Sequence, residues 1–577
     1  MRLRSLYVSN YGCIDEQGYE VEIDDIVILI GANNVGKSTI LDAYEAFASV
    51  GAALPLESFR GENPGNTVRI AGTFTDLSQE DVETLGKKWK YTHARFGDCV
   101  RVMWQWKTPD AKGEKFSWDP SKGDWVPGGM GGWDTLIASR VPLPLRVRPT
   151  DDAATTEAQV AEILVSAAKA AIKADQGKTA GVIAELEKLT ADLAKGVEAQ
   201  IQETVVKISQ RLAQVFPGHS VYFSPQIGKF DAEKVLGAGS HIRIEDPSHS
   251  RIPLSQQGAG LRRTFLWAAL GALADVGRIK QGRSQVPADR QRILLLEEPE
   301  SFLHPPMVRA AREALYGLAT IPEWQVMATT HSPVFIDVAK PHTTIVRIGQ
   351  GASTRTRVFS TDRASFSEDE RENLVSVRAC NPEVNEFFFA EHAWLVEGET
   401  EAVALSLLRL KDADAANLNV VIVNCLGKAN IPLFMRILNQ FGTPYTVIHD
   451  SDAPRCKRKD KWQTNPMWTV NQTIRETLEA RSGDLPKCML VVSVPDFEWT
   501  YYGFRLGSDK PYTAISTIQA PSFATDSSLE RLRTLVPSIL NGTHPFKYSS
   551  ADQLRKLVAE YVKTESPSPP EEWNLDG

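Results

Sequence analysis

A phosphate-binding loop between a predicted strand and a predicted helix is the feature that most restricts the fold of this 577-residue chain. The apolar run Ile26–Ile30 predicts a buried strand, the sequence GANNVGKS follows it over Gly31–Ser38, and the next residues to Phe47 predict a helix. Backbone N–H groups of such a loop point at phosphate oxygens at the positive end of the helix. Lys37 adds a point charge at the β- and γ-phosphates, and Ser38 is expected to ligate Mg²⁺.

The composition is that of an ordinary water-soluble protein, with 42% hydrophobic and 24% charged residues. No apolar run reaches the roughly 18 residues of a membrane span, and the first residues lack the apolar core of a signal peptide. Its 6 cysteines are scattered without a CxxC pair, which favours a reducing cytosol over a zinc ribbon or disulfide framework. We therefore expect a cytoplasmic protein. The net charge of −8 does not indicate nucleic-acid binding, although a local basic patch would suffice for it.

Three later segments narrow the class of ATPase. The sequence LSQQGAG at Leu254–Gly260 resembles the signature motif of ABC-type ATPases. Glu297 and Glu298 end an apolar strand and resemble the Walker B motif of that class, and the segment after them, SFLHP, resembles its D-loop region. His331 follows the predicted strand Gln325–Ala328 and resembles the H-loop. Each match is modest alone, but their order after the P-loop indicates an ABC-type ATPase head.

The resemblance assigns a role to each of these residues. Glu297 would support Mg²⁺ where most ABC ATPases have aspartate, and Glu298 would orient or deprotonate the attacking water. His331 would sense the γ-phosphate. Ser255 and Gly258 would reach the γ-phosphate held by a second subunit, which implies at least a homodimer. The residues expected to bind ATP or its Mg²⁺ are Asn33, Asn34, Gly36, Lys37, Ser38, Thr39, Ser255, Gly258, Glu297 and His331.

A long apolar stripe with helical spacing separates the two halves of this ATPase. Apolar residues recur at steps of three and four over Leu186–Val215. The spacing predicts a helical insertion at 153–216, either a subdomain packed on the core or an arm that pairs with a second subunit. Residues 1–152 and 217–359 are then the two parts of the ATPase.

A second set of short apolar strands alternates with helical segments after a polar stretch. The strands are expected at Ala393–Val396, Asn419–Val423, Thr446–Ile448 and Met489–Val492. This alternation predicts a second α/β domain with a parallel sheet over 389–563. We expect residues 360–388 to be a linker and residues 564–577 to be a disordered tail.

Carboxylates follow two of these predicted strands. Glu397 comes directly after the first strand, Gly398 allows a sharp turn there, and Glu401 lies one helical turn further on. Asp450 and Asp452 end a later strand. Because the carboxyl ends of parallel strands meet at one edge of an open sheet, these side chains should converge there. Their oxygens suit Mg²⁺ or Mn²⁺, and the arrangement resembles a Toprim domain, which topoisomerases, primases and certain nucleases share.

Further candidates lie close to these carboxylates in sequence. Glu498 is either another metal ligand or a surface carboxylate, and Lys510 either stabilises phosphate charge or is a surface lysine. The segment 427–430 is expected at the edge of the site. The basic run RCKRKDK over 455–461 is either a solvated loop or a DNA contact. We favour the DNA contact, because cations beside acidic ligands would draw in the DNA backbone.

An ABC-type ATPase followed by a Toprim domain resembles the OLD (overcoming lysogenization defect) family of nucleases, and most resembles the class that includes the nuclease subunit of the Gabija anti-phage system. The resemblance implies an ATP-regulated DNA endonuclease, a homodimer or larger homo-oligomer, and a UvrD-like helicase partner. It also implies two-metal chemistry with Mg²⁺, Mn²⁺ or Ca²⁺, in which Lys510 offsets transition-state charge. The implied metal ligands are Glu397, Glu401, Asp450, Asp452 and Glu498, with Ser38 at the nucleotide.

Two other functions stay open from the sequence. A DNA-repair ATPase of the RecF or SMC-like kind, which clamps DNA without cutting it, would explain residues 1–350 but give the later carboxylates no role. A topoisomerase or primase would use the Toprim domain, but the chain has no room for a DNA-cleavage domain with a nucleophilic tyrosine, and primases lack this ATPase. A cleavage assay on supercoiled plasmid separates these alternatives.

Overall fold

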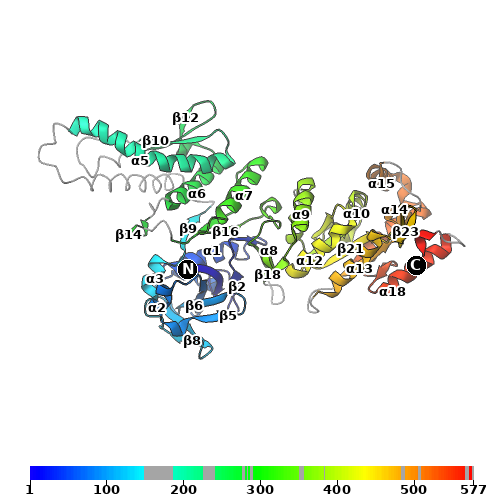
Figure 1. The fold of residues 1–577 in the computed structure, drawn as a ribbon, viewed down its shortest axis with the longest axis horizontal. Helices are drawn as coiled ribbons and strands as arrows, with labels where there is room; N and C mark the ends of the chain where they lie inside the picture. Colours follow the sequence, from blue (N-terminus) through cyan, green and yellow to red (C-terminus); the bar gives the residue numbers. More distant parts are fainter. Residues whose placement is uncertain are drawn as a thin grey trace. The chain divides into compact units, whose positions relative to one another are not determined.

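The chain forms two compact units, residues 1–337 with 342–356, and residues 338–341 with 357–577 (Figure 1). No helix among the described residues is long and apolar enough to cross a membrane. The computed structural model describes residues 1–148, 186–224, 241–275, 280–281, 284–285, 290–349, 356–381, 384–481, 488–503, 509–565 and 571–574.

A parallel sheet carries the phosphate-binding loop of the first unit. Its strands lie in the order β17-β3-β16-β15-β9 and all run parallel. Every residue of β3 and β16 is buried, as expected for central strands of a sheet covered on both faces. The strands are β3 (Ile26–Ile30), β9 (Leu143–Val147), β15 (Arg292–Glu297), β16 (Trp324–Thr329) and β17 (Thr343–Ile348), and the helices beside them include α1 (Lys37–Ala48), α6 (Ala259–Asp275) and α7 (Pro305–Ala319).

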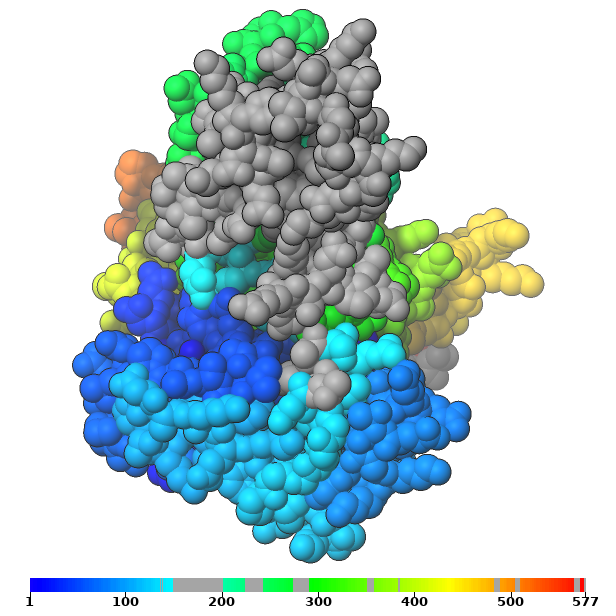
Figure 2. All heavy atoms as spheres, turned by 90° about the vertical axis from the view of Figure 1, so that its left-hand side faces the viewer, coloured from blue at the N-terminus to red at the C-terminus, as the bar shows by residue number. Residues whose placement is uncertain are grey.

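A 7-stranded antiparallel sheet belongs to the same unit, and its residues form the blue and cyan body in the lower part of Figure 2. Aromatic packing joins it to the helix that follows the P-loop, since the rings of Phe47 on α1 and Phe74 lie 5.7 Å apart. Trp133 on α3 (Trp133–Ser139) closes this cluster, 5.3 Å from Phe74. The strands are β1 (Arg2–Ser9), β2 (Tyr19–Glu22), β4 (Val68–Thr75), β5 (Tyr91–His93), β6 (Gly97–Trp106), β7 (Glu114–Asp119) and β8 (Asp124–Pro127).

The described part of the predicted helical insertion is a long helix, α5 (Leu186–Val215), which lies along α6 and α7 (Figure 1). In its second half the side chains of the apolar stripe are buried within the chain, namely Ile201, Val205, Ile208, Leu212 and Val215. This half of the stripe is therefore core of the first unit and not a free surface for a second subunit. The rest of the predicted insertion, residues 153–185, lies outside the described residues, as do the surroundings of the side chains over 186–200.

The second unit is built on a 5-stranded sheet in the order β20-β19-β21-β24-β25. Its first four strands are parallel, which confirms the predicted α/β domain, and β25 is antiparallel. The strands are β19 (His392–Val396), β20 (Val420–Asn424), β21 (Tyr445–Asp450), β24 (Met489–Ser493) and β25 (Lys547–Tyr548). The helices include α10 (Glu399–Lys411), α12 (Ile431–Phe441), α13 (Pro466–Glu479), α14 (Phe497–Tyr502), α15 (Lys510–Gln519) and α18 (Ala551–Glu565).

The polar segment 360–388, predicted as a linker, is helical. It holds α8 (Thr361–Ala364), α9 (Glu368–Cys380) and the short turn Val384–Phe388. The start of α9 is fixed by a capping box in which Ser367 and Glu370 bond each other's backbone. Buried Leu374 and Val377 then anchor the helix to the unit, so few apolar residues suffice here.

Part of the predicted tail over 564–577 also has structure. A turn at Glu571–Trp573 brings the Trp573 ring to 5.4 Å from that of Tyr561 on α18. Residues 566–570 and 575–577 lie outside the described residues.

Candidate functional site

The P-loop lysine is held inside its own loop. Lys37 is buried, and its Nζ donates to the carbonyls of Gly31 at 3.0 Å and Ala32 at 2.7 Å. Burial lowers the pKa of Lys37, while the charges of Glu298 and Glu300 oppose that shift. A phosphate arriving at the loop would take over these hydrogen bonds from the carbonyls.

The backbone conformation of the loop sets the positions of the other residues predicted to bind nucleotide. Asn33 and Asn34 are exposed, and Asn34 has a left-handed backbone with φ 62°. Gly36 has φ 106°, a conformation that side-chain-bearing residues avoid. Thr39 lies in the first turn of α1, where its Oγ1 is 3.4 Å from Cys13 Sγ.

Ser38 and Glu297 meet where the resemblance places Mg²⁺. The Ser38 hydroxyl donates to Glu297 Oε2 at 2.9 Å, so the two residues predicted to hold the Mg²⁺ of the nucleotide are in direct contact. A buried arginine, Arg146 on β9, pairs with the same carboxylate and with Asp42 on α1. Sequence reasoning missed Arg146, because no motif marks its strand.

Glu298 lies beside His331. The backbone of Glu298 is left-handed with φ 43°, and its carboxylate accepts a hydrogen bond from Ser301 Oγ at 2.9 Å. His331 Nε2 lies 3.8 Å from Glu298 Oε1, and burial lowers the pKa of this histidine. Half-buried Glu300, which the sequence analysis did not single out, accepts from Thr330 Oγ1 at 2.7 Å and from the His331 N–H at 2.9 Å. It therefore fixes the H-loop against the Walker B segment.

The signature segment faces outward. Ser255 and Gly258 are exposed just before α6, as required of residues that would meet another molecule. Gly260 follows them, and a Cβ there would lie 2.5 Å from the carbonyl oxygen of Phe302. Glycine is needed at this point because the segment after Glu298 passes directly over the start of α6.

The carboxylates of the second unit converge at the edge of its sheet, as predicted. Glu397 follows β19, Glu401 lies in the first turn of α10, and Asp450 ends β21. The Asp450 backbone N–H donates to Glu397 Oε2 at 3.3 Å, which ties the two strand ends together. The Asp450 Oδ1 atom is buried and has no hydrogen-bond partner among the described residues.

Electrostatics make this edge a place that favours a cation. Burial raises the pKa of Glu401 to about 7, and the charge of Glu397 adds to the shift. Burial also raises the pKa of Asp450 well above its ordinary range, with Glu397 and Glu401 contributing. The pKa of Glu397 is raised by burial and opposed by Lys428. Bringing several buried carboxylates together costs free energy that a bound cation would recover.

Lys428 neutralises part of the negative charge of these carboxylates. Its side chain is 0% exposed, and Nζ donates to Asp452 Oδ2 at 2.7 Å and to the carbonyls of Asp450 at 2.5 Å and Ser451 at 3.3 Å. Asp452, with φ 55°, is therefore held by Lys428 rather than left free. The sequence placed residues 427–430 only at the edge of the site and gave Lys428 no role.

Glu498 and Lys510 also belong to this edge. Glu498 is buried in the first turn of α14, and Lys510 Nζ lies 2.8 Å from its Oε1. The hydrogen bond to Glu498 raises the pKa of Lys510. Asp496, another residue without a predicted role, caps α14 by accepting from the Trp499 N–H at 2.8 Å. Its charge adds to the raised pKa of Asp450.

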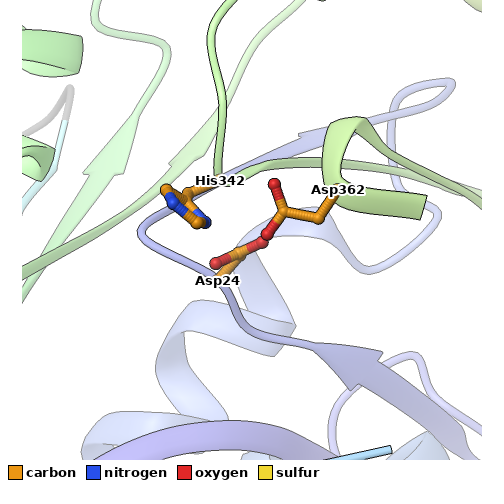
Figure 3. Close-up of side chains that lie close together, drawn as sticks. All are labelled: Asp24, His342 and Asp362. Carbon is orange, nitrogen blue, oxygen red and sulfur yellow. The ribbon is translucent and has the colours of Figure 1, made fainter. Parts of the chain in front are cut away.

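The donor set fits a divalent ion of the Mg²⁺ kind. The side chains that meet at this edge offer carboxylate oxygens, and Asp450 brings a buried oxygen to which no described residue donates a hydrogen bond. Figure 3 draws another group of ligand-type residues, Asp24, His342 and Asp362. Asp24 and His342 belong to the first unit and Asp362 to the second, so they do not make a site within either unit.

Comparison with known families agrees with this division of the chain. The family model "AAA ATPase domain" matches residues 1–203 and 148–336. The model "Overcoming lysogenization defect protein-like, TOPRIM domain" matches residues 388–452, the segment that contains Glu397, Glu401, Asp450 and Asp452. The ATPase model thus covers more than half of the chain.

Individual relatives carry the same name. The chain is 25% identical over 361 residues to the OLD nuclease of Thermus scotoductus, covering 60% of this chain and 64% of that protein, which is just under two thirds of the relative's length. It is 22% identical over 476 residues to the Old nuclease of Escherichia phage P2, covering 78% of this chain and 77% of that protein.

Solved structures of SMC heads are more distant. The Smc head bound to the C-winged helix domain of ScpA aligns with a TM-score of 0.40 at 13% identity, covering 63% of this chain and 99% of that chain. No conclusion rests on a similarity of this size. The two family models, taken in their order along the chain, and the two relatives give the assignment: this chain belongs to the OLD family, with an AAA ATPase domain followed by an OLD-like TOPRIM domain.

Proposed function

We propose that this protein is a divalent-metal-dependent DNA endonuclease whose activity ATP controls. The observation that carries the proposal is the converging set of Glu397, Glu401 and Asp450 at the edge of the second sheet, with Asp450 Oδ1 buried and without a hydrogen-bond partner among the described residues. An all-oxygen site of this kind suits phosphodiester hydrolysis, and both named relatives are called nucleases.

The chain's own residues divide the work at this site. Glu397, Glu401 and Asp450 would hold Mg²⁺ or Mn²⁺, with Asp452 and Glu498 as further ligands, and Ca²⁺ would bind the same oxygens. When bound, the ions would activate water and stabilise the leaving oxygen. Lys428 fixes the carboxylate of Asp452 and the two carbonyls before it. Lys510, whose side chain is 51% exposed, can turn toward a phosphate while it stays close to Glu498.

The first unit would bind ATP with Mg²⁺ at Lys37, Ser38 and Glu297, and Glu298 would act on the attacking water. We propose that exposed Ser255 and Gly258 complete the nucleotide site of a second copy, so that the active species is at least a homodimer. The proposal also includes three further points: closeness to the Gabija-type nuclease subunit, a role in anti-phage defence and a UvrD-like helicase partner. They would be tested by phage plating and by co-purification.

The test is incubation of the purified protein with supercoiled plasmid and Mg²⁺ or Mn²⁺, with and without ATP. Nicked or linear DNA that disappears in EDTA and in Glu397→Ala is the expected result. Relaxed closed circles would indicate a topoisomerase, and intact DNA retained on the protein would indicate a clamp. Either of these two results would overturn the nuclease assignment.

A further inference from the structure

A basic β-hairpin projects from the second unit directly after the carboxylates. Its strands are β22 (Arg455–Arg458) and β23 (Lys461–Thr464), which pair with each other and with no other strand in the described part of the chain. Every residue from 457 to 464 is exposed. A two-stranded hairpin is barely stable alone in water, so its base must be held by the rest of the unit. Because its residues are exposed, its two faces are free to contact a binding partner.

The base of this hairpin is fastened to the carboxylate site. The Asn465 backbone N–H donates to the carbonyl of Pro454 at 2.9 Å, and its Nδ2 donates to that of Ala453 at 2.9 Å. Asn471 of α13 then donates to the carbonyl of Ser451 at 2.8 Å. Because Ser451 lies between the two aspartates of the site, the hairpin is fixed relative to the carboxylates.

The tip concentrates positive charge. Lys459 and Asp460 form the two-residue turn with φ 49° and 59°, the type I′ geometry that Asn-Gly normally occupies. Two residues without glycine's freedom are therefore kept in a costly conformation. Lys457, Arg458, Lys459 and Lys461 are opposed only by Asp460 within the hairpin. The Lys457–Asp460 pair at 3.3 Å is exposed, so it neutralises little.

A large aromatic ring is exposed on the same ribbon. Trp462 is 37% exposed and lies directly across the two strands from Lys457. An exposed tryptophan ring beside a lysine on a projecting ribbon gains no stability from contact with water. The pair does suit a nucleic acid, whose phosphates attract the cation and whose sugars and base edges offer apolar surface to the ring.

We infer that this hairpin is the ribbon by which the second unit grips double-stranded DNA beside its carboxylates. Lys457, Arg458, Lys459 and Lys461 contact phosphates, and Trp462 packs against sugar and base edges in the groove. The major groove of DNA admits a two-stranded β-ribbon, and the cations offset the repulsion between the acidic edge and the DNA backbone. The inference rests on the proposed function only in taking DNA as the substrate.

The first experiment measures binding without cleavage. Full-length protein is titrated into a fluorescein-labelled DNA duplex in EDTA at several KCl concentrations, and anisotropy gives the affinity. Removing the cations with Lys457→Ala, Arg458→Ala, Lys459→Ala and Lys461→Ala should lower the slope of log affinity against log salt by about 3 to 4, since each phosphate contact contributes about 0.9.

A matched control removes the same charges elsewhere on the same unit. Lys547, Arg555, Lys556 and Lys563 are likewise three lysines and one arginine, and all are exposed. Changing them to alanine should leave the salt slope within about one contact of the wild type. An equal loss in both quadruple variants would show a general charge effect and overturn the inference, as would wild-type binding by the hairpin variant.

The second experiment concerns the ring. Trp462→Ala should weaken duplex binding roughly fivefold or more with the salt slope unchanged, and Trp462→Phe should restore most of the affinity. Loss of single-strand binding with duplex binding intact would overturn the assignment to duplex DNA.

Plasmid cleavage is scored separately. If the wild type cuts plasmid and the hairpin variants bind like it, only this inference fails. If the wild type binds through the hairpin but never cuts, only the nuclease proposal fails.

Discussion

Asp450 lowers the stability of the protein in a way that is explained by the proposed metal site. Its Oδ1 is buried and has no hydrogen-bond partner in the part of the chain that the structure describes, and three neighbouring carboxylates, those of Glu397, Glu401 and Asp496, disfavour its charge. Such an arrangement costs free energy in the absence of a cation, because burial and like charges both oppose ionisation. A side chain kept in this state is better explained by a ligand than by packing.

Replacing Asp450 with asparagine should therefore stabilise the protein while it removes cleavage. In EDTA we expect Asp450→Asn to raise the free energy of unfolding by about 1 kcal/mol or more, because a neutral side chain of the same shape replaces a carboxyl group whose ionisation is opposed in the folded protein but not in the unfolded chain. Mg²⁺ should raise the melting temperature of the wild type but hardly that of the variant. Exposed Asp414→Asn is the control and should change stability by less than about 0.5 kcal/mol. A less stable Asp450→Asn protein in EDTA would contradict this account.

Lys428 should be needed for the structure of the strand ends. Lys428→Met removes three hydrogen bonds, including the one to Asp452, and should cost about 1.5–3 kcal/mol in urea unfolding. Adding Asp452→Asn should recover part of that loss, since the unpaired carboxylate is then gone. Strictly additive losses in the double variant would show that the two residues are not coupled.

Residue-level prediction from the sequence succeeded where a motif marks the position and failed where a partner is distant in the chain. Glu397, Glu401 and Asp450 converge because the ends of parallel strands must meet. Lys428 and Arg146 gave no such signal. Lys428 contacts residues that lie 22 to 24 positions away, and Arg146 contacts Glu297, 151 positions away. Only the folded sheet brings those pairs together.

At the scale of elements, helical spacing identified α5 but did not say what covers it. Apolar residues at steps of three and four predict a helix equally well for a core helix and for a dimer arm. The structure assigns the half from Ile201 to Val215 to the core. For α9 the error was the opposite one, because the polar composition predicted a linker where the structure has a helix. A capping box and two buried apolar residues are enough to define that helix.

Core packing of α5 predicts a stability effect without a change of mass. Leu212→Ala should lower the free energy of unfolding by about 2–5 kcal/mol, since Leu212 is 0% exposed and its truncation leaves a cavity in the core. Val206 lies on the same helix but is 42% exposed, so Val206→Ala should cost little. Light scattering should give both variants the wild-type mass. A folded, fully stable Leu212→Ala protein of lower mass would show that this stripe is an interface after all.

The whole molecule separates two chemistries between two compact units. Candidate nucleotide-binding groups gather at the P-loop edge of the first sheet, around Lys37, Glu297 and Glu298. Candidate metal ligands gather at the equivalent edge of the second sheet, around Glu397 and Asp450. Both sites follow from one rule, that open parallel sheets expose polar groups at the carboxyl ends of their strands. The antiparallel sheet of residues 1–127 could not be ordered from its sequence, since its pairings depend on tertiary contacts.

This separation predicts that each activity can be removed alone. Glu298→Gln keeps the size of the side chain but loses the base, so ATP should still bind while its hydrolysis slows by roughly 10²–10⁴-fold. Cleavage of plasmid in the presence of Mg²⁺ should persist in that variant, because none of its metal ligands has changed. Glu397→Ala should give the reverse pattern, with ATP hydrolysis intact and cleavage lost.

The pair of variants also reads the sign of ATP control. Glu298→Gln with ATP is held in the nucleotide-bound state, so its cleavage rate relative to the same protein without ATP shows whether bound nucleotide opens or closes access to the second site. A cleavage rate unaffected by ATP in Glu298→Gln would remove nucleotide control from the proposal and leave the nuclease standing. Loss of both activities in either single variant would instead mean that the two units do not work as separate sites.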